Sequence, residues 1–166
     1  STPWNASTLR VSLAPLTTHG THSIQLSGGI SDRAGNGLDG STAYLYFLFD
    51  TVPPSFGSVS MVSSNPLDPL LARVGDSVAV LFSIADSGIP TPVVTIAGAP
   101  ADSVVLLGGI TWRATRQVQQ TDPAGPVQFT IDAMDRAGNS APTVTGVTYG
   151  EVVVIGSLDF GDAPDN

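Results

Sequence analysis

Several residue types are missing or scarce in this chain, and each absence removes a class of chemistry. Cysteine is absent, which excludes disulfides, thiolate metal sites and cysteine nucleophiles. Lysine is also absent, since all 6 basic residues are arginines, and this excludes a Schiff-base lysine, a P-loop lysine and a Lys–Asn isopeptide cross-link. Charged residues make up only 12%, while there are 18 glycines and 13 prolines. This balance favours many turns and few surface helices.

Positive charge and long apolar runs are scarce as well. The 14 acidic residues outnumber the 6 arginines, and the net charge is −8. Sequence-independent binding to nucleic acid requires clustered cations, so the composition argues against it. The longest unbroken apolar run, Ala43–Phe49, has 7 residues, whereas a membrane helix needs about 20. We expect no membrane span and no nucleic-acid partner.

Two-residue alternation of apolar and polar side chains dominates the pattern and predicts β-strands. It is cleanest from Val127 to Ala133, and it recurs from Val78 to Ile84. Glycine, proline, asparagine and aspartate clusters separate the segments, as turns require. Further strands are predicted at residues 8–14, 22–27, 43–51, 56–62, 93–97, 103–107, 110–118 and 143–155. The chain is therefore predicted to be all-β, an antiparallel β-sandwich.

An internal repeat sets the domain organisation. The string Asp-Arg-Ala-Gly-Asn at residues 32–36 recurs at residues 135–139, an offset of 103, and the same offset places residues 8–11 on 111–114. A period near 100 residues fits a repeated sandwich domain. Residues 1–51 match only the last three strands of a unit, and residues 52–155 hold a whole unit of about seven strands. Residues 156–166 are a tail or the start of a further module, and Pro53 and Pro54 form a stiff hinge.

These features together resemble bacterial Ig-like repeats, the modules of long secreted or surface-attached proteins that include adhesins. The resemblance covers about residues 8–155 and rests on the Asp-Thr-Val-Pro-Pro hinge at 50–54, the seven-strand pattern and the late Asp-Arg-Ala-Gly-Asn. It implies an Ig-like β-sandwich, about one and a half repeats in tandem, from the cell surface or outside the cell. The tail at residues 158–165 resembles the opening of another module of bacterial secreted proteins, which implies that the chain is cut from a larger protein at both ends. The second unit departs from the pattern, because Val153 and Val154 stand where its hinge is expected.

The repeated loop has two interpretations. Gly and Asn tolerate positive φ, so Ala-Gly-Asn suits a tight turn whose aspartate binds backbone amides of its own loop. Alternatively, carboxylate and amide oxygens bind calcium, and the resemblance implies that acidic loops at junctions between such modules sometimes do so. The candidate calcium ligands are Asp32, Asn36 and Asp50 at the junction, and Asp135 and Asn139 in the second loop. No other cofactor is predicted.

Other polar and aromatic residues favour structural roles. His19 and His22 flank a predicted turn, and no third ligand is near them in sequence. Trp112 is predicted to pack in the core, whereas Trp4 lies outside the repeat match and is freer to stack on a sugar. No Gly-x-Ser-x-Gly motif is present, and Glu151 is the only glutamate. We therefore expect no enzymatic activity. Asn5-Ala6-Ser7 is a glycosylation sequon.

Three non-catalytic functions remain open. The first is a structural spacer whose partners are neighbouring Ig-like domains. The second is a module that binds a surface glycan or a protein with loops at one end of the sandwich. The third is a self-assembling fibre subunit, in which residues 151–160 of one copy complete the half-unit of another by strand donation.

Overall fold

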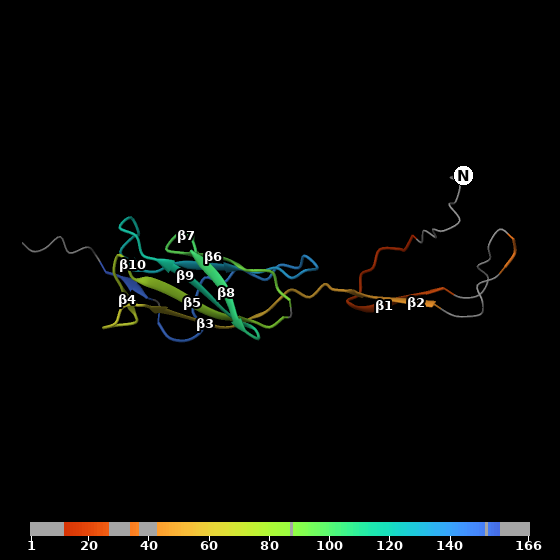
Figure 1. Cartoon of the computed structure of the whole chain (residues 1–166), viewed down its shortest axis with the longest axis horizontal. Coiled ribbons are helices and arrows are strands. Elements are labelled where there is room, and N and C mark those ends of the chain that lie inside the picture. Colours follow the sequence, from red (N-terminus) through yellow and green to blue (C-terminus); the bar gives the residue numbers. More distant parts are fainter. Residues whose placement is uncertain (1–11, 27–33, 37–42, 87, 152, 157–166) are drawn as a thin grey trace, which may run out of the picture. The chain divides into compact units, whose positions relative to one another are not determined.

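The computed structural model describes residues 12–26, 34–36, 43–86, 88–151 and 153–156. Every regular element among them is a β-strand, and none of these residues belongs to a helix long and apolar enough to cross a membrane. The chain divides into two compact units, Ser1–Val52 and Pro53–Asn166, here called unit 1 and unit 2 (Figure 1).

The described residues of unit 1 form one hairpin. Strand β1 (Gly20–Leu26) pairs antiparallel with β2 (Ala43–Phe49), so that Gly20 lies opposite Phe49 and Ile24 opposite Leu45. Most of the predicted strand at residues 8–14 lies outside the described residues, and its last three residues, 12–14, are exposed and not in a strand. The three-stranded half-unit predicted from the sequence is therefore described here as two strands.

The larger sheet of unit 2 has four antiparallel strands. Its order is β3-β5-β9-β8, with β3 (Phe56–Ser63), β5 (Ser77–Ile84), β9 (Thr111–Gln117) and β8 (Ser103–Gly108). Valine, isoleucine and threonine are frequent in these segments, and β-branched side chains fit a pleated surface. Strand β9 shows the expected alternation, because Trp112, Ala114 and Arg116 are buried between exposed or half-buried neighbours.

Two smaller groups of strands complete unit 2. One has the order β11-β6-β7, with β11 (Phe129–Asp132), β6 (Val93–Ile96) and β7 (Ala99–Pro100). The other has the order β10-β12-β4, with β10 (Gly125–Pro126), β12 (Val154–Ile155) and β4 (Leu71–Ala72). All of these pairs are antiparallel except β12 with β4, which is parallel. Only Val127 and Gln128 separate β10 from β11 along the chain.

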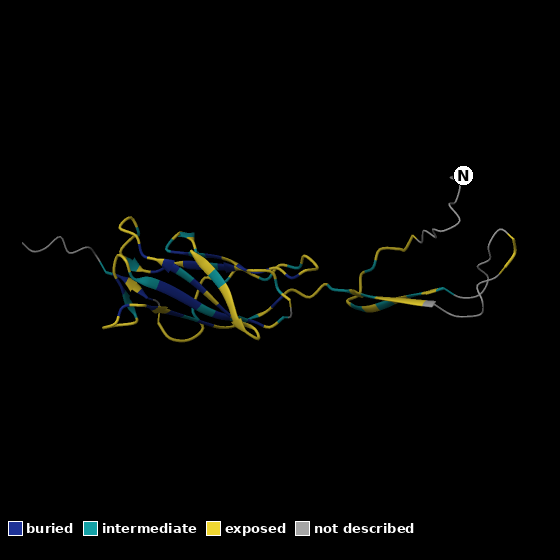
Figure 2. Ribbon diagram, in the orientation of Figure 1, coloured by how far each residue is buried: buried dark blue, intermediate teal, exposed yellow. Residues whose placement is uncertain are grey.

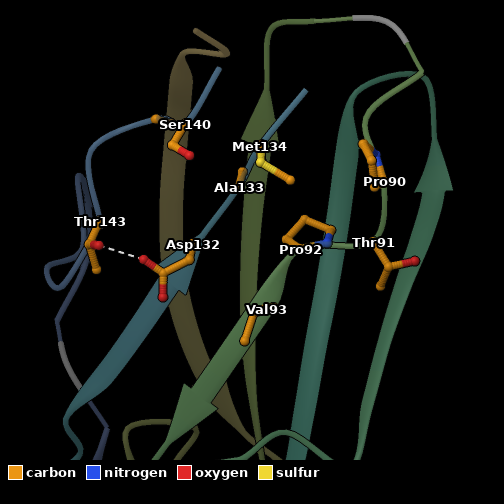
Figure 3. Close-up of a pocket in the computed structure, with 10 residues that line it drawn as sticks. Pro90, Thr91, Pro92, Val93, Asp132, Ala133, Met134, Ser140 and Thr143 are labelled. Atoms are coloured by element: carbon orange, nitrogen blue, oxygen red, sulfur yellow. Dashed lines mark hydrogen bonds between the residues drawn. The ribbon is translucent and has the colours of Figure 1, made fainter. Parts of the chain in front are cut away.

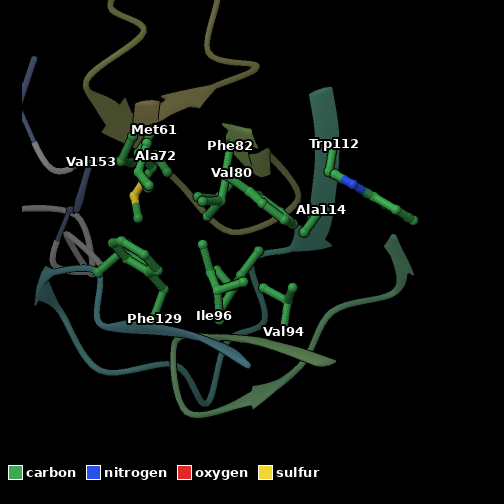
Figure 4. Packing of buried hydrophobic residues seen from close by; sticks show 14 of the residues in the cluster. Met61, Ala72, Val80, Phe82, Val94, Ile96, Trp112, Ala114, Phe129 and Val153 are labelled. Carbon is green, nitrogen blue, oxygen red and sulfur yellow. The ribbon is translucent and has the colours of Figure 1, made fainter. Parts of the chain in front are cut away.

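The hydrophobic core of unit 2 lies between the four-stranded sheet and the smaller groups (Figures 2 and 4). Figure 4 shows Val80, Phe82 and Met61 on one side of this core and Ile96 and Phe129 on the other. Every residue that alternation predicts for the core is at most 7% exposed: Val78, Val80, Phe82, Ile84, Trp112, Val127, Phe129 and Ile131. The predictions of an all-β chain and of this core are confirmed.

One predicted strand is wrong over most of its length. Residues 143–155 were expected to be one strand, but of those that the structure describes only Val154–Ile155 is. Val144 forms an isolated bridge with Ile131, and Thr148 then exchanges hydrogen bonds of 2.8 Å with Val59 of β3. Gly150 follows with a φ of +78°, a conformation that ends an extended run. The segment therefore crosses from one sheet to the other before β12 begins.

Candidate functional site

The second copy of the repeated string forms a closed turn at the end of β11. The backbone N–H of Asn139 donates to the Asp135 carboxylate at 2.8 Å, and Asn139 Nδ2 donates to its other oxygen at 2.7 Å. Asp135 N–H in turn donates to the Asn139 carbonyl at 3.1 Å. Gly138 has a φ of +94°, which a glycine adopts without a steric penalty. These contacts are those of the tight-turn interpretation.

Asp135 is only 5% exposed, yet its hydrogen bonds favour the charged form. Burial raises the pKa of this carboxyl, but the Asn139 side chain and the backbone amides of Asn139, Ala137 and Gly138 together lower it below the ordinary value. Because Asn139 presents its NH₂ group and not its oxygen to Asp135, a calcium ion could use this pair only after the amide had turned.

The first copy of the string, at the junction, is described only in part. Asp32 lies outside the described residues, while Gly35 has a φ of +90°, close to that of its counterpart Gly138, and Asn36 is exposed. The Asp50 carboxylate accepts the Val52 N–H at 3.0 Å. No group of three or more acidic, histidine or cysteine residues suited to a metal occurs among the described residues. Calcium binding by Asp32, Asn36 and Asp50 stays a prediction.

The two histidines of unit 1 have separate partners. His19 Nδ1 lies 3.2 Å from Asp50 and 3.3 Å from the Thr51 N–H. This nitrogen donates to Asp50 when it carries a proton and accepts from Thr51 when it does not. His22 stacks on Phe47 at 5.7 Å and donates from Nε2 to the Thr18 carbonyl at 2.9 Å. The predicted turn is shorter than expected, because β1 begins at Gly20.

A groove of about 320 Å³ lies at the end of unit 2, beside the Asp135–Asn139 turn (Figure 3). It is bordered by the segment that leads into β6 and by the segment that follows β11. Its lining residues are Pro90, Thr91, Pro92, Val93, Asp132, Ala133, Met134, Ser140, Ala141 and Thr143. Sequence reasoning missed this groove, because its two sides lie about 40 residues apart in the chain.

The lining of the groove combines exposed apolar side chains with a single carboxylate. Val93 and Met134 are 66% and 50% exposed, so apolar surface is open to solvent. The Thr143 hydroxyl donates to Asp132, the one carboxylate of the lining (Figure 3). No histidine, arginine or second carboxylate belongs to the lining, so the Asp132 carboxylate, which accepts the Thr143 hydroxyl, has no second acid–base group beside it there.

Aromatic side chains differ in their access to a ligand. Trp112 is 7% exposed, which confirms its packing role, and Trp4 and the Asn5 sequon lie outside the described residues. Tyr44 and Tyr46 are 52% and 64% exposed, and their rings stack at 5.9 Å. Sequence reasoning did not single out this pair. Its signal was the alternation Tyr-x-Tyr on a strand, which places both rings on one face.

The one strong ion pair of the described residues has a structural role. Arg116 holds Asp122 with two hydrogen bonds, of 2.6 and 2.8 Å, and their side chains are only 9% and 6% exposed. Asp122 also accepts the Gln119 N–H at 2.8 Å. The bond from Arg116 lowers the pKa of Asp122 most, against the effect of burial. The pair fixes the loop after β9 and leaves no charge free for a ligand.

The segment expected to be donated to another copy is used inside unit 2. Val153 and Ile155 are 0% and 4% exposed, and β12 pairs with β4 and β10 of the same unit. Donating these residues would uncover the core of their own unit, and strand donation by residues 151–160 stays a prediction. Residues 157–166 lie outside the described residues. Glu151 is exposed and lies apart from the groove.

No family model, no curated protein and no solved structure matches this chain.

Proposed function

We propose that this chain is a non-catalytic structural module, an Ig-like β-sandwich preceded by part of a second such unit, that spaces other domains of a secreted or surface-attached bacterial protein. Its partners are neighbouring Ig-like domains. The observation that carries the proposal is the repetition of one loop, because Gly35 and Gly138 adopt φ values of +90° and +94° within two copies of Asp-Arg-Ala-Gly-Asn. Repetition of a whole structural unit is typical of spacer proteins.

The strand order supports an Ig-like sandwich. One sheet of an immunoglobulin domain has its strands, lettered in chain order, side by side as A, B, E and D. The four-stranded sheet has this arrangement, with β3 as A, β5 as B, β9 as E and β8 as D. The other sheet takes β6, then β10 with β11, then β12 as C, F and G. The second sheet requires β10 and β11 to act as one strand, which their separation by only two residues allows.

The spacer proposal is tested by surface display. One to four copies of the chain are placed between a membrane anchor and an antibody epitope on a bacterial cell. We expect epitope access to rise with copy number, and Met134→Asp in the groove to change nothing. Access that does not depend on copy number contradicts the proposal, and a partner captured only by the unaltered groove supports a binding module instead.

The proposal includes calcium binding only at the candidate site of the junction between the two units. An ion that binds the folded state alone stabilises it by about 2.7 kcal/mol at a hundredfold excess over Kd. The measurement is the melting midpoint in calcium and in chelator. We expect Asp50→Asn, and not Asp135→Asn, to remove any calcium-dependent rise, because Asp135 already accepts donors at both oxygens. Equal midpoints for the unaltered chain exclude calcium.

Glycan binding is a second candidate, favoured by the exposed Tyr44 and Tyr46 pair. Aromatic faces open to solvent can stack on apolar faces of sugar rings. The test is a glycan array probed with the chain and with Tyr46→Ala. Leu48→Ala is the control, since Leu48 is on the same strand face and is 62% exposed but has no ring. Binding that disappears only with Tyr46→Ala supports this candidate, and an empty array contradicts it.

A further inference from the structure

One face of the unit 1 hairpin carries apolar side chains that the described residues cover only in part. We call the side chains of His22, Ile24, Leu26, Leu45, Phe47 and Phe49 the hairpin face, since paired residues and alternate residues of a hairpin share one side. Leu45 is 62% exposed, the other five are half-buried, and none of the six is fully buried. Two-stranded hairpins are marginally stable on their own. A segment that packs on this face would therefore stabilise the hairpin.

Unit 2 contains the same hairpin with its cover in place. The offset of 103 carries His22 onto Gly125 and Ile24 onto Val127. Gly125 lies opposite Ile155, as His22 lies opposite Phe47. Val127 N–H donates to the Val153 carbonyl at 2.9 Å, where Ile24 lies opposite Leu45. The two hairpins therefore correspond pair by pair, although the connection in unit 2 is five residues longer.

Burial separates the two copies. Val127, Val153 and Ile155 are at most 4% exposed, whereas Leu45, the counterpart of Val153, is 62% exposed. The opposite faces agree with each other, because Val154 and its counterpart Tyr46 are both exposed, at 38% and 64%. The contrast is greatest at Leu45, on the face that corresponds to the one packed on the core in unit 2 (Figure 4).

In unit 2, the outer edge of β12 is paired with a strand from the first half of the unit, β4. The Val154 N–H donates to the Leu70 carbonyl at 2.8 Å, and the Gly156 N–H donates to the Ala72 carbonyl at 2.9 Å. These bonds form the parallel pair of β12 with β4. By the same register, the backbone N–H groups of Tyr46 and Leu48 lie on the outer edge of β2. Among the described residues, β1 is the only strand that pairs with β2.

We infer that the hairpin face and the outer edge of β2 are the docking surface for the first half of a unit of the same kind, with strands equivalent to β3 to β7. Its β4-like strand pairs parallel with β2 through Tyr46 and Leu48, and its apolar sheet covers Ile24, Leu45 and Phe47. Main-chain bonds supply affinity and the alternate side chains supply register, as in strand addition to a sheet edge. The inference rests on the proposed repeat.

The test completes the unit in one polypeptide. A copy of residues 53–103 is joined directly ahead of Ser1, because the offset of 103 makes Ser1 equivalent to Val104. Amide hydrogen exchange is then measured on the full chain with and without this addition. We expect exchange at Tyr46 and Leu48 to slow by about tenfold or more. Leu45→Asp should abolish that protection, and Leu48→Asp should leave Tyr46 protected, although both leucines are 62% exposed.

Two results overturn the inference. One is unchanged exchange at Tyr46 and Leu48 in a chain whose β5 and β9 amides are protected. The other is an unextended chain that is dimeric and becomes monomeric with Leu45→Asp, which assigns the hairpin face to a second copy. The amides of unit 2 and the display experiment report on the spacer proposal separately, so either proposal can fail alone.

Discussion

At the scale of single residues, the buried carboxylates of unit 2 are stabilised by hydrogen bonds to groups close to them in the chain. The carboxylate of Asp135 is held by its own turn, and that of Asp122 by Arg116 six residues away. Neither charge depends on a partner outside the unit. Polar groups that are satisfied within the unit suit a module that is joined to different neighbours, because the stability of the module then does not depend on those neighbours.

The turn at Asp135 should be sensitive to its glycine. Gly138→Ala places a side chain at a φ of +94°, which costs about 1–2 kcal/mol in the left-handed region. Gly146→Ala is the matched control, since that glycine has no positive φ and a methyl group there would meet nothing within 4 Å. Chemical denaturation of both variants is the measurement. Equal losses of stability would remove the conformational explanation.

The Arg116–Asp122 pair should make the free energy of unfolding fall as the pH is lowered into the acidic range. The folded pKa of Asp122 lies below the ordinary value of an aspartate, so the unfolded state binds more protons in the interval between the two. Its contribution is therefore complete above the unfolded pKa and is lost as the pH falls through the folded one. Asp122→Asn should cost about 1–3 kcal/mol at neutral pH and flatten the decline below about pH 4. An unchanged slope in acid contradicts the prediction.

Sequence could predict the turn at Asp135 but not the groove beside it. Gly138 and Asn139 are local signals, because the conformation they adopt depends on neighbours within four residues. The groove joins Pro90–Val93 to Asp132–Thr143, and no local pattern reports which loops meet at the end of a sheet. The ion pair of Asp122 with Arg116 was missed for a similar reason, because it can be predicted only once Arg116 is known to lie on the buried face of β9.

At the scale of elements, β12 is a two-residue strand with a large structural role. Ile155 is 4% exposed and Val154 is 38% exposed, although they are neighbours. Ile155→Ala should destabilise unit 2 by about 2–4 kcal/mol, whereas Val154→Ala should change stability by about 0.5 kcal/mol or less. Thermal unfolding measures both. Similar effects of the two changes would mean that β12 is not packed on the core.

Strand prediction succeeded where alternation is long and failed where pairing is short. Strands β5 and β9 have seven or eight residues with a period of two, so their buried sides could be read directly. Strands β4, β7 and β10 have two residues each, and two of them contain proline, so no period exists to read. The segment around Thr148 was misread because its cross-sheet contact with Val59 depends on tertiary structure alone.

At the scale of the whole molecule, the two units differ in completeness. Unit 2 has a core whose apolar and polar groups are satisfied internally, and none of its described side chains leaves a buried polar atom without a hydrogen bond. Unit 1 has a hairpin without a core among its described residues. A repeat-built spacer requires each complete unit to fold by itself, since units of such proteins act as separate modules.

The most direct measurement of this account is the thermal unfolding of residues 53–156 alone beside the full chain. We predict one cooperative transition for the isolated unit, with a midpoint within about 4 °C of the full chain, because a loss of 1 kcal/mol would move it by roughly that much. The absence of a cooperative transition, or a midpoint much lower than that of the full chain, would show that both units share one core and would contradict the account of an independent module.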